Sequence, residues 1–112
     1  MRMWMINPKY LCRKHLLGEH NEIHKHRPSF EKKHSIKGRL SPIVLIEPAA
    51  MQTRHDEIVE EMLARGYNHK SPYTLPDLSY LSEEELKFKV DIEVSMQELM
   101  KRCPDCMNRM KG

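Results

Sequence analysis

Residues 8–27, PKYLCRKHLLGEHNEIHKHR, are the stretch that decides the fold. Asn7 followed by Pro8 is typical of a helix start, because Asn caps a helix and Pro fits its first turn. We expect one helix from Pro8 to about Lys25. Four titratable side chains on it recur at steps of four, three and four, which places them on one stripe: His15, Glu19, Glu22 and His26.

Pro28 is expected to end this helix, because the residue before a proline is biased away from the α conformation. Ser29–His34 would then form a short second helix or a turn. The apolar run Ser41–Ile46 fits a buried extended segment as well as a helix.

A clearer helix is predicted over Ala49–Arg65, with an apolar face and Gly66 as its C-cap. Ser82 and Glu85 form the sequence pattern of a capping box at the start of a short helix. A last helix is expected from about Ile92 to Cys103. Strand patterns have almost no support, so the sequence predicts an all-α fold, a small bundle of three to five helices.

Length and composition favour one small domain covering residues 1–112. The chain is 39% hydrophobic, and no apolar run approaches the roughly 20 residues needed to span a bilayer. Three cysteines without an export signal indicate reduced thiols in a cytoplasmic setting. We expect a monomer with no membrane partner and no cofactor.

Charge is uneven along a chain whose formal net charge is only +3. Eight Lys and Arg face three Glu between Arg13 and Arg39, whereas seven acids face two lysines between Asp77 and Glu98. This pattern predicts a polyanion contact on one face; the alternative is a solvated basic helix. Candidate phosphate contacts are Arg2, Arg13, Lys14, Lys25, Arg27, Lys32, Lys33, Lys37 and Arg39.

A short leader, residues 1–7, precedes the first helix, so the α-amino group of Met1 could fold back to Glu22. An amine beside a carboxylate is suited to imine chemistry, and a terminal amine is more often neutral than a lysine because its pKa is about 7.7–8.0 against roughly 10.4. The alternative is that Glu19 and Glu22 only pair with His15 and His26.

Two patterns raise the question of a metal. His20 and His24 are four residues apart, as are Glu22 and His26, but no third ligand follows at a recognisable spacing. The pair Cys103 and Cys106 is half of a zinc site, which Cys12 or a histidine could complete. Free thiols in a terminal segment are the other interpretation, and we expect no metal.

Two stretches resemble the phage-type pyrimidine-dimer DNA glycosylases, the UV-repair enzymes of the T-even endonuclease V type. The first is Met1-Arg2 followed by His-Leu-x-x-Glu-x-x-Glu over residues 15–22, with the family's distance from the terminal amine. The second is Arg54–Asn68, which is similar to the family's third helix and its Arg-Gly-aromatic-Asn ending.

This resemblance implies a compact α-helical protein that binds damaged double-stranded DNA and flips a nucleotide out of the stack. It implies an α-amine that attacks C1′ and an essential glutamate, which fall on Met1 and Glu22. It also places Arg2, His15 and Lys25 near the DNA. Together with the small size of the chain, it suggests a bacterial or phage-infected host cell. The leading prediction is a DNA glycosylase with abasic-site (β-elimination) lyase activity on pyrimidine dimers or other damaged bases.

Two alternatives remain open: a non-catalytic or zinc-stabilised DNA-binding accessory module of the same fold, and a glycosylase for modified bases. The chain also departs from the family. Asn21 stands where the family has an arginine before its catalytic glutamate, and Ile46-Glu47-Pro48 replaces a small loop. Residues 103–112 contain the two cysteines in place of an aromatic tail.

Overall fold

A computed structural model describes residues 3–40, 43–68, 73 and 76–111. Over these residues the protein contains α-helices and short 3₁₀ turns and no strand, which confirms the all-α prediction. The elements in chain order are η1 (Pro8–Tyr10), α1 (Arg13–Glu31), η2 (Lys37–Arg39), η3 (Pro48–Ala50), α2 (Met51–Ala64), α3 (Glu83–Lys87), α4 (Ile92–Arg102) and α5 (Pro104–Lys111).

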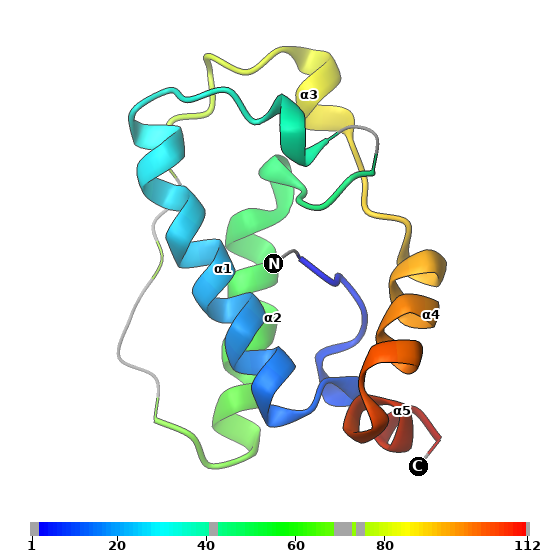
Figure 1. The fold of residues 1–112 in the computed structure, drawn as a ribbon. Coiled ribbons are helices and arrows are strands. Elements are labelled where there is room, and N and C mark those ends of the chain that lie inside the picture. The colour runs from blue at the N-terminus through cyan, green and yellow to red at the C-terminus, as the bar shows by residue number, and fades with distance from the viewer. Residues whose placement is uncertain (1–2, 41–42, 69–72, 74–75, 112) are drawn as a thin grey trace.

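The N-terminal segment runs through the middle of the molecule. Figure 1 shows α1 and α2 side by side, with α4 and α5 across from them and the segment 3–7 in between. The Met3 amide donates to the Leu45 carbonyl at 2.8 Å, and the Ser95 hydroxyl on α4 donates to the Trp4 carbonyl at 2.7 Å. The segment is therefore held from both sides.

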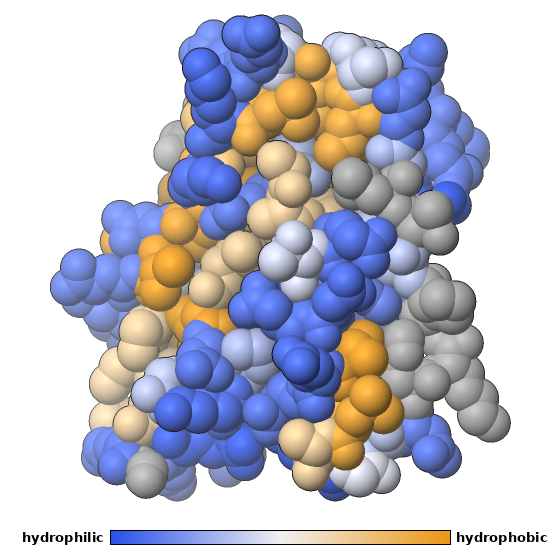
Figure 2. All heavy atoms as spheres, turned by 180° about the vertical axis from the view of Figure 1, so that it is seen from behind, coloured by the Kyte–Doolittle hydropathy of each residue, from blue (hydrophilic) through white to orange (hydrophobic). Residues whose placement is uncertain are grey.

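The core lies where these elements meet, and its members come from nearly every part of the chain. Figure 2 shows the face opposite to that of Figure 1, where hydrophilic side chains surround separate apolar patches. The apolar side chains that are at most 2% exposed are Met3, Ile6, Leu11, Leu16, Ile23, Phe30, Ile46, Met51, Ile58, Leu99 and Cys106.

The first helix begins later than predicted. Asn7 caps a turn, as expected, by accepting from the Lys9 amide at 3.1 Å, but η1 ends at Tyr10 and α1 starts at Arg13. The chain is extended at the buried Leu11, and the Arg65 guanidinium donates to the Leu11 carbonyl at 2.7 Å. This long-range bond satisfies a carbonyl that a continuous helix would have used itself.

The prediction that Pro28 ends the first helix is wrong, because α1 continues through it to Glu31. Phe30 is completely buried in the last turn. Burying such a side chain stabilises by roughly 1.5–3 kcal/mol, which is comparable to the cost of about 3 kcal/mol for an interior proline. Lys33, with φ at 58°, lies just after this helix.

Three other predicted elements are confirmed with small shifts of their ends. The helix α2 is followed by Gly66 at φ 84°, a conformation that favours glycine. Ser82 and Glu85 form the capping box of α3, and α4 starts at Ile92. The helix α5 was not predicted. No helix among the described residues is long and apolar enough to cross a membrane.

A buried ion pair joins α1 to α2. The Arg54 Nε and Nη2 atoms donate to the two carboxylate oxygens of Glu19 at 2.5 and 3.0 Å. The two side chains are 1% and 0% exposed. The two-point geometry satisfies both carboxylate oxygens and fixes how α1 is rotated against α2.

We expect Arg54→Met to lower the free energy of unfolding by about 3–5 kcal/mol, because it leaves the Glu19 charge buried without its partner. The double variant Glu19→Leu, Arg54→Met removes both charges and should recover much of that loss. Urea denaturation followed by circular dichroism measures both. A cost below about 1 kcal/mol for Arg54→Met, the range of an exposed pair, would contradict this account.

Candidate active site

Glu22 is a buried carboxylate with two basic neighbours. It is 3% exposed, and its Oε1 atom lies 3.4 Å from Nη1 of Arg39 and 3.5 Å from Nδ1 of His26. The His26 Nδ1 atom is also 2.9 Å from the Glu22 main-chain carbonyl, which suits a proton on that nitrogen. The carboxylate is thus oriented from two sides.

A polar hollow of about 180 Å³ lies beside this pair of contacts. The two basic neighbours of Glu22 are in its wall, together with an exposed lysine of α1. Its lining residues are Lys25, His26, Ser29, His34, Ser35, Ile36 and Arg39. The walls carry basic and hydroxyl groups, so the hollow suits an anion such as a phosphate.

Met3 is connected to Arg39 by a short series of contacts. The Met3 amide bonds to the Leu45 carbonyl, and the Leu45 amide bonds to the Arg39 carbonyl at 2.8 Å. The Arg39 side chain then reaches Glu22. Met1 and Arg2, two of the predicted site residues, lie outside the described residues.

The two carboxylates of the predicted stripe have different partners. Glu22 does pair with His26, as the alternative prediction had it. Glu19 bonds to Arg54 on α2, and the ring of His15 lies against sulfur atoms at the other end of α1. Four residues of one stripe therefore belong to three separate sites.

A second group of titratable side chains lies between α1 and α2. The rings of His20 and His24 are 4.7 Å apart, and His55 on α2 lies 5.1 and 4.9 Å from them. One nitrogen of each lies within 4.8 Å of the others, which is close enough for a shared metal ion. His55 is the third residue that sequence spacing missed, because α2 supplies it. Burial raises the pKa of the adjacent Tyr73.

The predicted phosphate contacts that the structure describes lie mostly at the surface. The exposed ones are Arg13, Lys14, Lys25, Lys32, Lys33, Lys37 and Arg39. Arg27 is half-buried beside Glu31, with which it forms an ion pair, and Arg13 lies over the Tyr67 ring at 5.2 Å. Trp4 is 6% exposed and belongs to the core.

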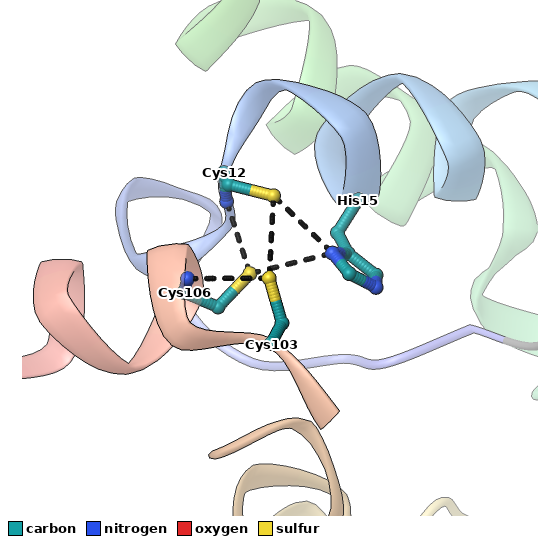
Figure 3. Close-up of side chains that lie close together, drawn as sticks. All are labelled: Cys12, His15, Cys103 and Cys106. Atoms are coloured by element: carbon teal, nitrogen blue, oxygen red, sulfur yellow. Dashed lines mark hydrogen bonds between the residues drawn. The ribbon is translucent and has the colours of Figure 1, made fainter. Parts of the chain in front are cut away.

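Three cysteines and one histidine from both ends of the chain meet at the start of α1 (Figure 3). Cys12 Sγ lies 3.2 Å from His15 Nδ1 and 3.7 Å from Cys103 Sγ. The Cys106 Sγ atom lies 3.5 Å from the same histidine nitrogen. All three cysteines are buried free thiols.

Local electrostatics differ among these four groups. Burial, followed by the charges of Lys14 and Arg102, lowers the pKa of His15, which favours the neutral ring. Burial raises the pKa of Cys106 to about 12. Burial also works against a Cys103 thiolate, yet hydrogen bonds from the Cys106 amide and the neighbouring thiols hold the pKa of Cys103 below its usual value.

A larger cavity of about 580 Å³ adjoins this cluster and shares His15 with it. Its walls are partly apolar and come from the N-terminal segment, the start of α1, residues 43–45 and α4. They are formed by Trp4, Lys14, His15, Ile43, Leu45, Val94, Glu98 and Arg102. Glu22, His26 and Arg39 are absent from this lining, so the two hollows are separate.

Comparison with known proteins bears on the part of the chain that carries Glu22. The family model described as pyrimidine dimer DNA glycosylase matches residues 1–75, more than half of the chain. No curated protein and no solved structure matches significantly. The match contains η1, α1, α2 and the hollow beside Glu22, whereas α3, α4 and α5 lie beyond it.

Proposed function

Because the chain belongs to the pyrimidine dimer DNA glycosylase family, we propose that it is a bifunctional DNA glycosylase and abasic-site lyase for pyrimidine dimers or other damaged bases. The observation that carries the proposal is the buried Glu22 carboxylate, held by Arg39 beside a polar hollow. The proposed nucleophile is the α-amino group of Met1. The proposed substrate is damaged double-stranded DNA, and the protein acts as a monomer.

The chemistry needs an amine that is neutral near physiological pH, and an α-amino group meets this need better than a lysine. The amine attacks C1′ and the C1′–N bond breaks; the base departs with that electron pair and gains a proton. The sugar then opens to an imine with the amine. Loss of a proton from C2′ expels the 3′ oxygen and cleaves the strand.

Glu22 serves both halves of this reaction in the proposal. Its charge stabilises the positive charge that develops on the sugar as the base leaves, and its oxygen atoms then carry protons during imine formation and elimination. The tie from Met3 through Leu45 to Arg39 supports a position of the chain start near this carboxylate. The Arg39 guanidinium bonds to only one of the two carboxylate oxygens, Oε1.

The basic side chains around the hollow are proposed to hold the phosphates next to the lesion. Lys25 and Arg39 are exposed and share its wall, and Lys32, Lys33 and Lys37 follow closely in sequence. These contacts give affinity without reading sequence, which suits an enzyme that must find damage in any context. Arg2 is proposed to join them.

Two other functions use the same fold. A non-catalytic accessory module would bind DNA without turnover, and the cysteine and histidine cluster at the start of α1 favours such a stabilised module. A glycosylase for modified bases would share the mechanism and differ in the lesion. Borohydride trapping on an abasic-site duplex distinguishes the accessory module, which forms no adduct, from an enzyme. A panel of damaged duplexes distinguishes a glycosylase for modified bases from one for pyrimidine dimers.

Glu22→Gln keeps the size of the side chain and removes its charge. We expect base release to fall by roughly 10²–10⁴-fold, the usual contribution of such a group, while binding of damaged DNA persists. Its main cationic partner, Arg39, is 44% exposed and stays hydrated after the change, so the fold should tolerate it. Single-turnover cleavage of an irradiated duplex measures the rate.

The matched control is Glu57→Gln, an exposed position on α2. Glu19→Gln cannot serve, because Arg54 would lose its buried partner. If Glu22→Gln cleaves at the parent rate, the catalytic assignment is wrong.

Lys25→Ala with Lys33→Ala should weaken binding to any duplex. Each lysine of the pair that contacts a phosphate should, when removed, reduce the magnitude of the slope of log K against log salt by roughly 0.9, because fewer counterions are released on binding. Fluorescence anisotropy at several salt concentrations gives the slope. The control pair, Lys89→Ala with Lys101→Ala, removes the same charge from an exposed loop residue and α4 and should leave the slope nearly unchanged. Equal slopes for both pairs would place the DNA elsewhere.

Acetylating the Met1 amine, or extending the chain with an uncleaved tag, should abolish imine trapping and strand cleavage together. The reactive nitrogen is then blocked, whereas the helices and the basic side chains are unchanged. Salt-sensitive DNA binding and the helical circular-dichroism signal should persist. Mass spectrometry of the trapped parent should locate the adduct on residue 1; an adduct on Lys14 or Lys25 would overturn the proposed nucleophile.

A further inference from the structure

We propose that Cys12, His15, Cys103 and Cys106 together bind one zinc ion, which fastens the two C-terminal helices to the start of α1. The four side chains come from segments 91 residues apart. Each offers one ligand atom, and all four atoms lie within 4.8 Å of one another. They converge on one point (Figure 3).

The spacing of the ligand atoms fits a tetrahedral ion. Zn–S bonds of about 2.3 Å and Zn–N bonds of about 2.0–2.1 Å place two sulfurs about 3.8 Å apart and a sulfur and a nitrogen about 3.6 Å apart. The observed separations are 3.7 Å between the Cys12 and Cys103 sulfurs, and 3.2 and 3.5 Å from His15 Nδ1 to the Cys12 and Cys106 sulfurs. Little movement is needed to reach this geometry.

Main-chain amides point at two of the sulfurs, as expected for thiolates. The Cys106 amide donates to Cys103 Sγ at 3.4 Å, which closes the Cys-x-x-Cys turn. The Cys12 amide donates to Cys106 Sγ at 3.2 Å. Cys12 is also the N-cap of α1, where the helix dipole favours negative charge. The backbone therefore offsets part of the charge of three thiolates.

The ligand set selects the ion. Three thiolates and one imidazole in a tetrahedron are typical of structural zinc, because all four positions are filled by protein. Each thiol that binds gives its proton to the solvent, and nothing is oxidised or reduced. A disulfide would need two sulfurs at about 2.05 Å, so the Cys12 and Cys103 thiols at 3.7 Å are not bonded.

The ion would act on a junction that positions the N-terminal segment. Around it, Arg109 Nε on α5 donates to the Lys9 carbonyl at 2.8 Å, and Arg65, the C-cap of α2, donates to the Leu11 carbonyl. Trp4 lies edge-on to His15, with ring centroids 5.8 Å apart. Zinc would thus hold α5, the start of α1 and one wall of the larger cavity in one arrangement.

Metal analysis of the purified full-length chain, incubated with ZnCl₂ and gel-filtered, tests the proposal without any activity assay. We expect one zinc per chain and an X-ray absorption spectrum with three sulfurs at about 2.3 Å and one nitrogen at about 2.0–2.1 Å. Chelation by EDTA should lower the thermal midpoint, and added ZnCl₂ should restore it. A shell of nitrogen and oxygen only, or no zinc uptake by the reduced protein, would overturn the proposal.

Variants locate the ion. Cys106→Ser should lose the zinc, whereas His20→Gln, on the same helix as His15 but in the other histidine group, should keep it. Zinc that is lost with His20→Gln and kept with Cys106→Ser would overturn the assignment. If Cys106→Ser fails to fold, the sulfur count in the spectrum of the parent chain still decides. A disulfide found by mass spectrometry of the unreduced, freshly purified protein would also overturn it.

Discussion

The two-point ion pair between Glu19 and Arg54 is the contact on which the rest of the site depends. Both charges are removed from water, which costs several kcal/mol for each ion unless geometry and hydrogen bonds compensate. Because of this cost, α1 cannot easily turn about its axis. Such a rotation would separate the two buried charges, and no water could take the place of the lost partner. The direction in which α1 presents its next turn is therefore fixed, and that next turn carries Glu22.

Two glutamates three residues apart consequently lie in different surroundings. Glu19 faces an arginine that is 1% exposed, whereas Glu22 faces one that is 44% exposed. Coulomb attraction is screened far more strongly at the second site, and the exposed guanidinium can move when a ligand enters. A carboxylate that is locked on both oxygens cannot exchange protons with a substrate. Among the described residues a guanidinium contacts only Oε1 of Glu22, which suits the acid–base role proposed for this carboxylate.

Sequence spacing predicted the local parts of this structure and missed the parts made by tertiary contact. The Ser82 capping box and the Gly66 C-cap are encoded within four residues, so they could be predicted. The passage of α1 through Pro28 depends on the burial of Phe30 against other segments, which no local rule contains.

The same division holds for the candidate site. The stripe on α1 was visible, because a helix repeats every three to four residues. Arg54, the partner of Glu19 in that stripe, comes from α2, as does His55, which joins His20 and His24 outside the stripe. These partners could not be read from spacing. Cys103 and Cys106 were recognised as half of a set, but only the fold shows that Cys12 and His15 lie with them.

A chain terminus is an unusual place for a reactive group, because it lacks the helix or strand that positions most catalytic side chains. Catalysis needs reacting atoms held within a fraction of an ångström, so a terminal amine requires external supports. In the proposed mechanism the contacts of the residues next to the terminus would give this support: Leu45 and Ser95 bond to residues 3 and 4, and Arg65 and Arg109 bond to the turn that follows. The cluster at Cys12 anchors the far end of the same segment. The C-terminal helices lie outside the family match, yet they contact this segment: Ser95 on α4 bonds to Trp4, and Arg109 on α5 bonds to Lys9. In the proposed mechanism these helices would act by positioning the segment and not by touching the substrate.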